Sequence, residues 1–183
     1  MEKEIIWGDV ETNGTDDHKS DVLLEVAVLV TDTDLNILDE NGYQAVIYYS
    51  EEEVEAIKAK TSPYVIDMHT KTGLWDRLPQ GKPLEQVDAE LLAYLKTLVP
   101  GEKTARLAGN SITLDRNFMR KFLPLSFNHL HYRSIDVSTL AGLAQYWTKP
   151  QVQYRKKTLH SAFSDITESI EELRFLRKNI MSV

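Results

Sequence analysis

Cysteine is absent from the 183 residues of this chain, and cationic side chains are in the minority, with 21 Lys and Arg against 28 Asp and Glu. The lack of cysteine excludes disulfides, thiolate zinc sites and cysteine nucleophiles. The formal net charge of −7 argues against a module that grips long duplex nucleic acid over a wide face, because cationic surface drives that binding. It is compatible with an enzyme whose carboxylates hold cations and meet a short anionic substrate through them.

Long hydrophobic runs are also missing. No stretch approaches the ~20 apolar residues that a membrane span needs. Residues 1–11 carry acids beside their one short apolar run, unlike a secretory signal. Apolar residues make up 42% of the chain and charged residues 27%, which is typical of a folded protein. We therefore expect residues 1–183 to form a single domain of a soluble, cytoplasmic protein.

The hydrophobic pattern changes along the chain from strand-like to helical. Residues 4–11, the very apolar run 22–30 and residues 37–49, with a break at Asn41-Gly42, predict three strands in an antiparallel meander. Helical spacing then predicts helices at 51–59, 63–70, 84–98, 113–122, 137–147 and from 162 onward, with short strands at 106–109 and 131–135. This order predicts a mixed sheet covered by helices, in an α/β or α+β sandwich.

Two acids stand at the end of the first predicted strand. Asp9 and Glu11 are two residues apart, and side chains at i and i+2 of a strand point to the same face. Because their neighbours are apolar, the two carboxylates would repel each other on a half-buried surface, and a divalent cation between them is the economical solution. The alternative is that the strand ends at Gly8 and both acids are solvated loop residues.

Two further acids lie on the flanks of apolar helical stripes. Asp115 falls near the start of the helix at 113–122, where an acid also suits the helix dipole. Asp165 begins the last helix beside an apolar stripe that runs from Ala162 to Ile180. The polar residues predicted to lie opposite that stripe are Glu168, Glu171, Glu172 and Lys178.

His160 precedes Asp165 by five residues. Five helical residues turn by ~140°, so the two side chains converge only if His160 lies on the loop before the helix. A histidine on such a loop suits a general base, whereas the alternative is an ordinary surface histidine. With the four acids it points to one chemistry, in which two divalent ions ~3.5–4 Å apart ionise a water and stabilise the leaving oxygen of a phosphodiester. Magnesium or manganese suits such an all-oxygen site.

Three segments carry a resemblance to a known family. Asp9-Val-Glu11, Asn110-Ser-Ile-Thr-Leu-Asp115 and His160-Ser-Ala-Phe-Ser-Asp165 resemble the motifs of the DEDDh 3′→5′ exonucleases, which have a ribonuclease-H-like fold. Within them the chain resembles the oligoribonucleases over nearly its whole length, most diagnostically in residues 131–140. The resemblance implies a mixed five-stranded sheet, an antiparallel meander plus parallel strands, flanked by helices.

The resemblance also implies an activity. The relatives are homodimeric 3′→5′ exoribonucleases that hydrolyse very short RNA, dinucleotides above all, to mononucleotides. By the resemblance, Asp9, Glu11, Asp115 and Asp165 would hold two divalent cations, Mg2+ or Mn2+, and His160 would deprotonate the attacking water.

Other positions match residues that hold the substrate in the family. Ser111, Arg133 and Ser138 fall where the family caps the 5′ phosphate, and an arginine with two hydroxyls suits a phosphate. Tyr132 falls where a side chain reaches into the site of the partner subunit. The alternatives are an ordinary salt bridge for Arg133 and a core or interface aromatic for Tyr132.

Two positions depart from the family pattern. Tyr64 stands in the place of a base-stacking tryptophan, and Thr15 in the place of the leucine that wedges between the two bases. The smaller, more polar Thr15 puts strict dinucleotide specificity in question. A broader DEDDh exonuclease acting on longer RNA or DNA is therefore the second hypothesis. A catalytically silent nucleic-acid-binding module of the same fold is the third, and the presence of all four acids and the histidine argues against it.

Overall fold

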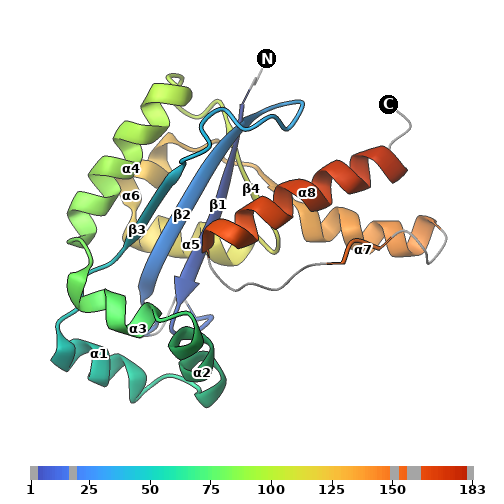
Figure 1. The fold of residues 1–183 in the computed structure, drawn as a ribbon. Helices are drawn as coiled ribbons and strands as arrows, with labels where there is room; N and C mark the ends of the chain where they lie inside the picture. The colour runs from blue at the N-terminus through green and yellow to red at the C-terminus, as the bar shows by residue number, and fades with distance from the viewer. Residues whose placement is uncertain (1–3, 17–19, 149–152, 156–161, 181–183) are drawn as a thin grey trace.

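The computed structural model describes residues 4–16, 20–148, 153–155 and 162–180 (Figure 1). Its centre is a five-stranded sheet in the order β3-β2-β1-β4-β5. β1 (Glu4–Thr12), β2 (Leu23–Asp32) and β3 (Tyr43–Val46) are antiparallel neighbours. β4 (Arg106–Gly109) and β5 (Ser134–Asp136) run parallel to β1. The predicted mixed sheet, a meander plus parallel strands, is confirmed.

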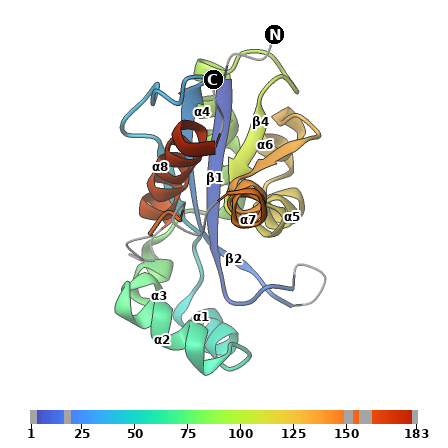
Figure 2. The same ribbon diagram turned by 90° about the vertical axis from the view of Figure 1, so that its right-hand side faces the viewer.

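Helices cover both faces of this sheet and one of its ends (Figures 1 and 2). α4, α5 and α6 pack on one face, α7 and α8 pack on the other, and α1, α2 and α3 lie beyond the end at which β1 finishes. No helix among the described residues is both long and apolar enough to cross a membrane. The helices are α1 (Glu51–Lys58), α2 (Pro63–Lys71), α3 (Leu74–Arg77), α4 (Leu84–Leu98), α5 (Thr113–Phe122), α6 (Pro124–His129), α7 (Val137–Trp147) and α8 (Ala162–Ile180).

β1 divides the core between the two helical layers. Ile6 and Val10 pack into the apolar cluster that includes α4 and α5. Trp7 packs into the other cluster, with α7 and α8. Because side chains alternate along a strand, Asp9 and Glu11 project from β1 toward the face that α8 covers. β1 continues to Thr12, so the interpretation of Asp9 and Glu11 as solvated loop residues after Gly8 is wrong.

The strand predicted over 37–49 is mostly wrong. Only Tyr43–Val46 forms β3, and Ile37 makes a single bridge with Thr31. Gly42 interrupts the strand with a left-handed φ of 59°, and a Cβ there would lie 2.7 Å from the Leu29 side chain, so that only glycine fits without strain. The strand predicted at 131–135 is likewise shorter and later in the chain, at Ser134–Asp136.

The predicted exposure of one side of α8 is partly wrong. Glu168 and Glu172 are 9% and 7% exposed, although helical spacing places them opposite the apolar stripe. The reason is tertiary, because α8 contacts α7 as well as β1 and β2 and is covered on more than one side. Glu172 also accepts a hydrogen bond from the Asn110 amide at 3.0 Å. Burial of this carboxylate therefore reflects a polar partner rather than an apolar contact.

Candidate active site

Three carboxylates converge at the end of β1 where α8 begins. Asp9 and Glu11 reach this point from β1, and Asp165 reaches it from the first turn of α8. Each offers an oxygen, and the three oxygens lie within 4.8 Å of one another. An all-carboxylate set at this spacing fits a hard divalent cation such as Mg2+ or Mn2+.

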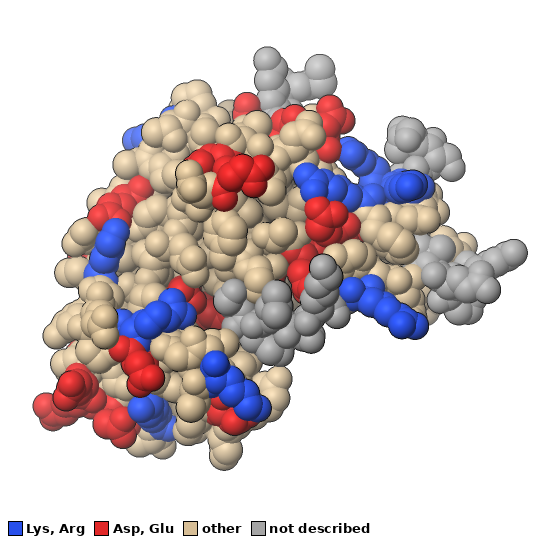
Figure 3. Space-filling view, in the orientation of Figure 1, with Lys and Arg blue, Asp and Glu red and all other residues tan. Residues whose placement is uncertain are grey.

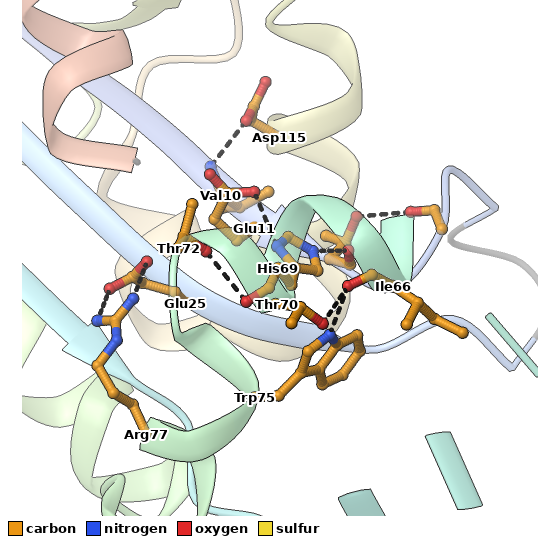
Figure 4. A network of polar contacts seen from close by, with 12 residues as sticks. Val10, Glu11, Glu25, Ile66, His69, Thr70, Thr72, Trp75, Arg77 and Asp115 are labelled. Carbon is orange, nitrogen blue, oxygen red and sulfur yellow. Dashed lines mark hydrogen bonds and ion pairs between the residues drawn. The ribbon is translucent and has the colours of Figure 1, made fainter. Parts of the chain in front are cut away.

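Asp115 joins the group from the other face of the sheet. β4 pairs with β1 only from Ile5 to Trp7, so the neighbouring edge of β1 is open beyond Trp7. The N-terminal turn of α5 fills this edge, and Asp115 Oδ1 accepts a hydrogen bond from the Val10 backbone N–H at 2.9 Å (Figure 4). Asp115 is 5% exposed. The structure thus places Asp115 beside the strand segment that carries Asp9 and Glu11.

The protonation of these acids reflects their crowding. Burial, and after it the negative charges of Asp165, Glu25 and Asp115, raise the pKa of Glu11 to about 8 against the opposing effect of Arg77. Burial likewise raises the pKa of Asp115 to about 7. Without a cation, the protein therefore favours protonated forms of acids that are normally ionised at neutral pH. A divalent cation removes this conflict, since it stabilises the ionised carboxylates directly.

His69 supports the same end of β1 and was not identified from the sequence. This buried residue of α2 donates a hydrogen bond from Nε2 to the Thr12 carbonyl at 2.8 Å, and its Nδ1 lies 4.0 Å from Glu11 Oε2 (Figure 4). Burial lowers the pKa of His69, which favours the neutral ring. Its ring packs edge-on against Trp75, with centroids 5.4 Å apart. The sequence offered no signal for this role, because the contact joins residues 57 positions apart.

An ion pair with a buried acid and a partly exposed arginine lies next to His69. Glu25, on β2 opposite Glu11, is 1% exposed and is bound by both terminal nitrogens of Arg77, at 2.8 and 3.4 Å (Figure 4). Gln44 donates a third hydrogen bond to it at 3.0 Å. The sequence carried a signal for Glu25, since it is the single charge in the apolar run 22–30. Arg77 neutralises an acid that would otherwise repel Glu11.

Ser111 and Ser138 meet at the other side of the carboxylates, where β4 ends and α7 begins. Ser111 has a left-handed φ of 51°, and its backbone N–H donates to Asp136 Oδ1 and to Ser138 Oγ, both at 3.1 Å. The two hydroxyl oxygens are 3.4 Å apart. Asp136 also caps α7 by accepting from the Ser138 N–H at 2.9 Å. We call this pair of serines the serine cup.

Arg133 and Tyr132 lie on the exposed segment before β5. The Arg133 guanidinium stacks over the Tyr132 ring at 5.2 Å, and Tyr132 is 71% exposed. The Arg133 backbone N–H donates to His131 Nδ1 at 3.1 Å, which shapes the turn. At this exposure Tyr132 is not a core aromatic of this chain. Among the described residues, no ion pair supports the alternative of an ordinary salt bridge for Arg133.

Thr15 and Tyr64 lie on neighbouring segments at the acidic end of the sheet. Thr15 is exposed in the loop after β1, and Tyr64 is 71% exposed in the first turn of α2. Asn13 joins the two segments, because its side chain accepts from the Val22 N–H at 2.7 Å and donates to Thr61 Oγ1 at 3.3 Å. His160, predicted as the general base, lies outside the described residues.

Comparisons with known proteins identify the family of the chain. The family model described as exonuclease matches residues 6–173. The chain is 39% identical to an oligoribonuclease of Leifsonia xyli, over 95% of this chain and 82% of that protein. It is also 39% identical to an oligoribonuclease of Actinobacillus pleuropneumoniae, over 98% of this chain and 95% of that protein.

Solved structures resemble the chain in fold. Exonuclease I of Methylocaldum szegediense superimposes with a TM-score of 0.72 at 16% identity, over 98% of this chain and 41% of that one. E. coli exonuclease I in complex with a dT13 oligonucleotide superimposes with a TM-score of 0.68 at 16% identity, over 97% of this chain and 41% of that one. This chain spans about two fifths of the exonuclease I chains, so the likeness describes the shared nuclease fold alone.

Proposed function

Since this chain belongs to the oligoribonuclease group of the exonuclease family, we propose that it is a 3′→5′ exoribonuclease that hydrolyses very short RNA, dinucleotides above all, to nucleoside 5′-monophosphates. The observation that carries the proposal is the convergence of Asp9, Glu11 and Asp165 within 4.8 Å, with Asp115 on the adjoining backbone. Crowding the carboxylates of Asp9, Glu11 and Asp165 at one strand end costs stability when no cation lies between them, so the cluster points to a function beyond holding the fold.

The four acids would hold two divalent cations, Mg2+ or Mn2+, which activate water and stabilise negative charge on a phosphodiester. Asp9 and Glu11 present their carboxylates from the rigid β1, and Asp165 closes the set from α8. Asp115 fixes the Val10 backbone and adds the fourth carboxylate. His69 holds Thr12, and thereby the strand segment that carries Glu11.

His160 is the proposed general base. Its imidazole would take the proton of the attacking water while the new P–O bond forms and the bond to the 3′ oxygen of the preceding nucleotide breaks. The products are the 3′-terminal nucleoside 5′-monophosphate and the remaining 5′ portion. The support for His160 is its motif position five residues before Asp165.

The serine cup with Arg133 would bind the 5′ phosphate and so measure substrate length. Ser111 and Ser138 lie together at the cup, and Arg133 is on the segment that leads into β5. Tyr132 would act in the site of the partner subunit of a homodimer, and its 71% exposure leaves it accessible to such a partner. Tyr64 would stack on a base, and Thr15 would contact the bases from the loop after β1.

The surface supports a small substrate. On the face shown in Figure 3, acidic and basic side chains alternate, and the described residues form no broad basic field there. With a net charge of −7, long nucleic acid has little electrostatic reason to bind. We retain a cytoplasmic location as part of this proposal, because RNA fragments of this size arise where RNA is degraded.

The deciding experiment is hydrolysis of a 5′-phosphorylated RNA dinucleotide with Mn2+ or Mg2+, followed by chromatography of the nucleotides. We expect conversion to mononucleotides that chelation of the metal abolishes. No turnover with either metal would overturn the proposal, and sedimentation as a monomer would remove Tyr132 as a residue supplied by the partner.

One observation favours a second candidate, a broader 3′→5′ exonuclease on longer RNA or DNA. Thr15 lacks the bulk to wedge between two bases. A 20-nucleotide strand degraded as fast as the dinucleotide would favour this candidate and contradict the role of the serine cup.

A further inference from the structure

The serine cup is tied to α8 by one side chain, Asn110. This residue follows β4 and uses both ends of its amide. Its Oδ1 accepts a hydrogen bond from Ser138 Oγ at 3.0 Å. Its Nδ2 donates to Ser169 Oγ at 2.9 Å and to Glu172 Oε2 at 3.0 Å. The orientation of the amide is fixed by chemistry, since a carboxylate accepts only from the NH2 end.

The chain of hydrogen bonds continues to a proposed metal ligand. Ser169 lies one helical turn after Asp165 on α8, and its hydroxyl donates to the Asp165 backbone carbonyl at 2.8 Å. Ser169 and Glu172 are 5% and 7% exposed, so water competes little for these bonds. An unbroken path therefore runs from Ser138 through Asn110 and Ser169 to Asp165.

Ser138 is the point at which a bound phosphate acts on this path. Its hydroxyl hydrogen is donated to Asn110, and its oxygen accepts from the Ser111 N–H. A phosphate oxygen can only accept hydrogen bonds. Ser138 must therefore turn its hydroxyl hydrogen from Asn110 Oδ1 to the phosphate, and Asn110 loses this hydrogen bond. The loss of this hydrogen bond is transmitted to α8 by the Asn110 amide, which contacts both Ser138 and the α8 residues Ser169 and Glu172.

We propose that Asn110 is a positioning residue that couples the 5′-phosphate cup to α8, so that occupancy of the cup acts on the placement of Asp165 and raises the rate of hydrolysis. The inference rests on the proposed function and adds a regulatory link within its site. A 5′ phosphate then contributes to kcat as well as to KM. Only an amide supplies an acceptor to Ser138 and donors to Ser169 and Glu172 within so short a side chain.

The test compares two RNA dinucleotides, one with a 5′ phosphate and one with a 5′ hydroxyl. We define the phosphate preference as the ratio of their kcat/KM values. In Asn110→Ala we expect this preference to fall about tenfold, mainly through kcat on the phosphorylated substrate, as for the loss of a partner that orients a ligand. Activity on the 5′-hydroxyl dinucleotide should change by less than about threefold. An equal fall on both substrates would overturn the coupling, because a merely structural role lowers both.

Ser126→Ala is the matched control. Ser126 is a fully buried serine of α6 on the opposite face of the sheet, and its hydroxyl donates to the Asp88 carbonyl at 3.0 Å. Its loss removes a comparable buried hydrogen bond far from the path, so the phosphate preference should stay unchanged. A fall there equal to that in Asn110→Ala would overturn the assignment to Asn110.

A double-mutant cycle measures whether Ser138 and Ser169 act on hydrolysis together, through Asn110, or independently. Ser138→Ala and Ser169→Ala should be non-additive in kcat on the phosphorylated dinucleotide, and the non-additivity should vanish in the Asn110→Ala background. Ser169→Ala alone also tests the link if Asn110→Ala fails to fold. Full additivity in the unaltered background overturns the inference. No turnover of either dinucleotide by the unaltered chain overturns the proposed function, and the inference with it.

Discussion

The acidic end of β1 and the serine cup lie side by side but are stabilised in opposite ways. At the strand end, Glu11 and Asp115 are buried carboxylates whose pKa values rise to about 8 and about 7. In the cup, Ser111 and Ser138 satisfy one another and their neighbours with neutral groups around a single capping acid, Asp136. The first region needs a cation to resolve its charges, whereas the second is complete without a ligand. In the metal-free chain, the proposed catalytic region therefore lowers stability, whereas the proposed phosphate-binding region does not.

The largest expected effect comes from removing one acid. Asp165→Asn keeps the shape of the side chain but removes a charge that a cation needs, so kcat on the phosphorylated dinucleotide should fall by about 10³-fold, or about 4 kcal/mol. Steady-state kinetics with saturating Mn2+ measures this loss. Asp34→Asn, an exposed acid on the loop after β2, is the matched control and should leave kcat unchanged. If Asp165→Asn retains a tenth of the activity, the acidic cluster is not the catalytic region.

The second effect is on stability and depends on pH. The pKa of Glu11 is about 8 in the folded chain against an ordinary 4.5, so the folded state holds a proton that the unfolded state releases. The metal-free protein should therefore be most stable below pH 4.5 with respect to this group and lose about 1–3 kcal/mol as the pH rises through 8. Asp115 contributes a further loss of stability as the pH rises from 3.8 to about 7, because its pKa is raised in the same direction.

Urea unfolding at pH 5 and pH 8 in the presence of a chelator measures this loss. Glu11→Gln removes one of the two titrating groups and should reduce the difference in stability between the two pH values, with Asp115 accounting for the remainder. Saturating Mn2+ should reduce the difference in the unaltered chain by binding the ionised form. A metal-free protein whose stability shows the same pH dependence in the Glu11→Gln variant would contradict the charge conflict. Ser138→Ala keeps both buried acids, so its stability should show the same pH dependence as that of the unaltered chain.

The sequence located the acids better than the residues that support them. Asp9, Glu11, Asp115 and Asp165 each interrupt or flank an apolar pattern, and such a position is visible in one dimension. His69 has no such signal, since its contact with Thr12 is created by folding. The predicted length of β3 was wrong for a related reason, since it too depends on a tertiary contact.

The limits of β3 depend on Gly42, whose left-handed backbone packs against Leu29 of the neighbouring strand. Helix bounds were predicted well where the apolar spacing is regular over several turns, as in α4 (Leu84–Leu98). The burial of Glu172 was missed because it depends on Asn110, 62 positions away. Local pattern therefore finds the chemical groups of the site, and tertiary contacts decide how they are held.

A smaller effect, on substrate binding, is expected from a change at the proposed phosphate site. Arg133→Ala removes a cation from the proposed phosphate site but no residue of the acidic end, so KM for the phosphorylated dinucleotide should rise about tenfold, or about 1.4 kcal/mol. The rate at saturation should change less. Titration of initial rates with substrate measures both, and the 5′-hydroxyl dinucleotide should be almost unaffected. An equal rise in KM for both substrates would mean that Arg133 does not contact the 5′ phosphate.

The smallest expected effect tests the loop that follows β1. Thr15 is exposed at the end of the loop that Asn13 anchors to Val22 and Thr61, so a larger apolar side chain fits there without disturbing the core. Thr15→Leu should raise the ratio of dinucleotide to 20-nucleotide hydrolysis about threefold, because a leucine in contact with two bases adds about 0.7 kcal/mol of apolar burial. Competition between the two substrates in one reaction measures this ratio directly. Thr97→Leu, an exposed threonine of α4, is the matched control for added surface hydrophobicity. If Thr15→Leu leaves the ratio unchanged, the loop does not reach the bases, and length selection belongs to the serine cup and Arg133 alone.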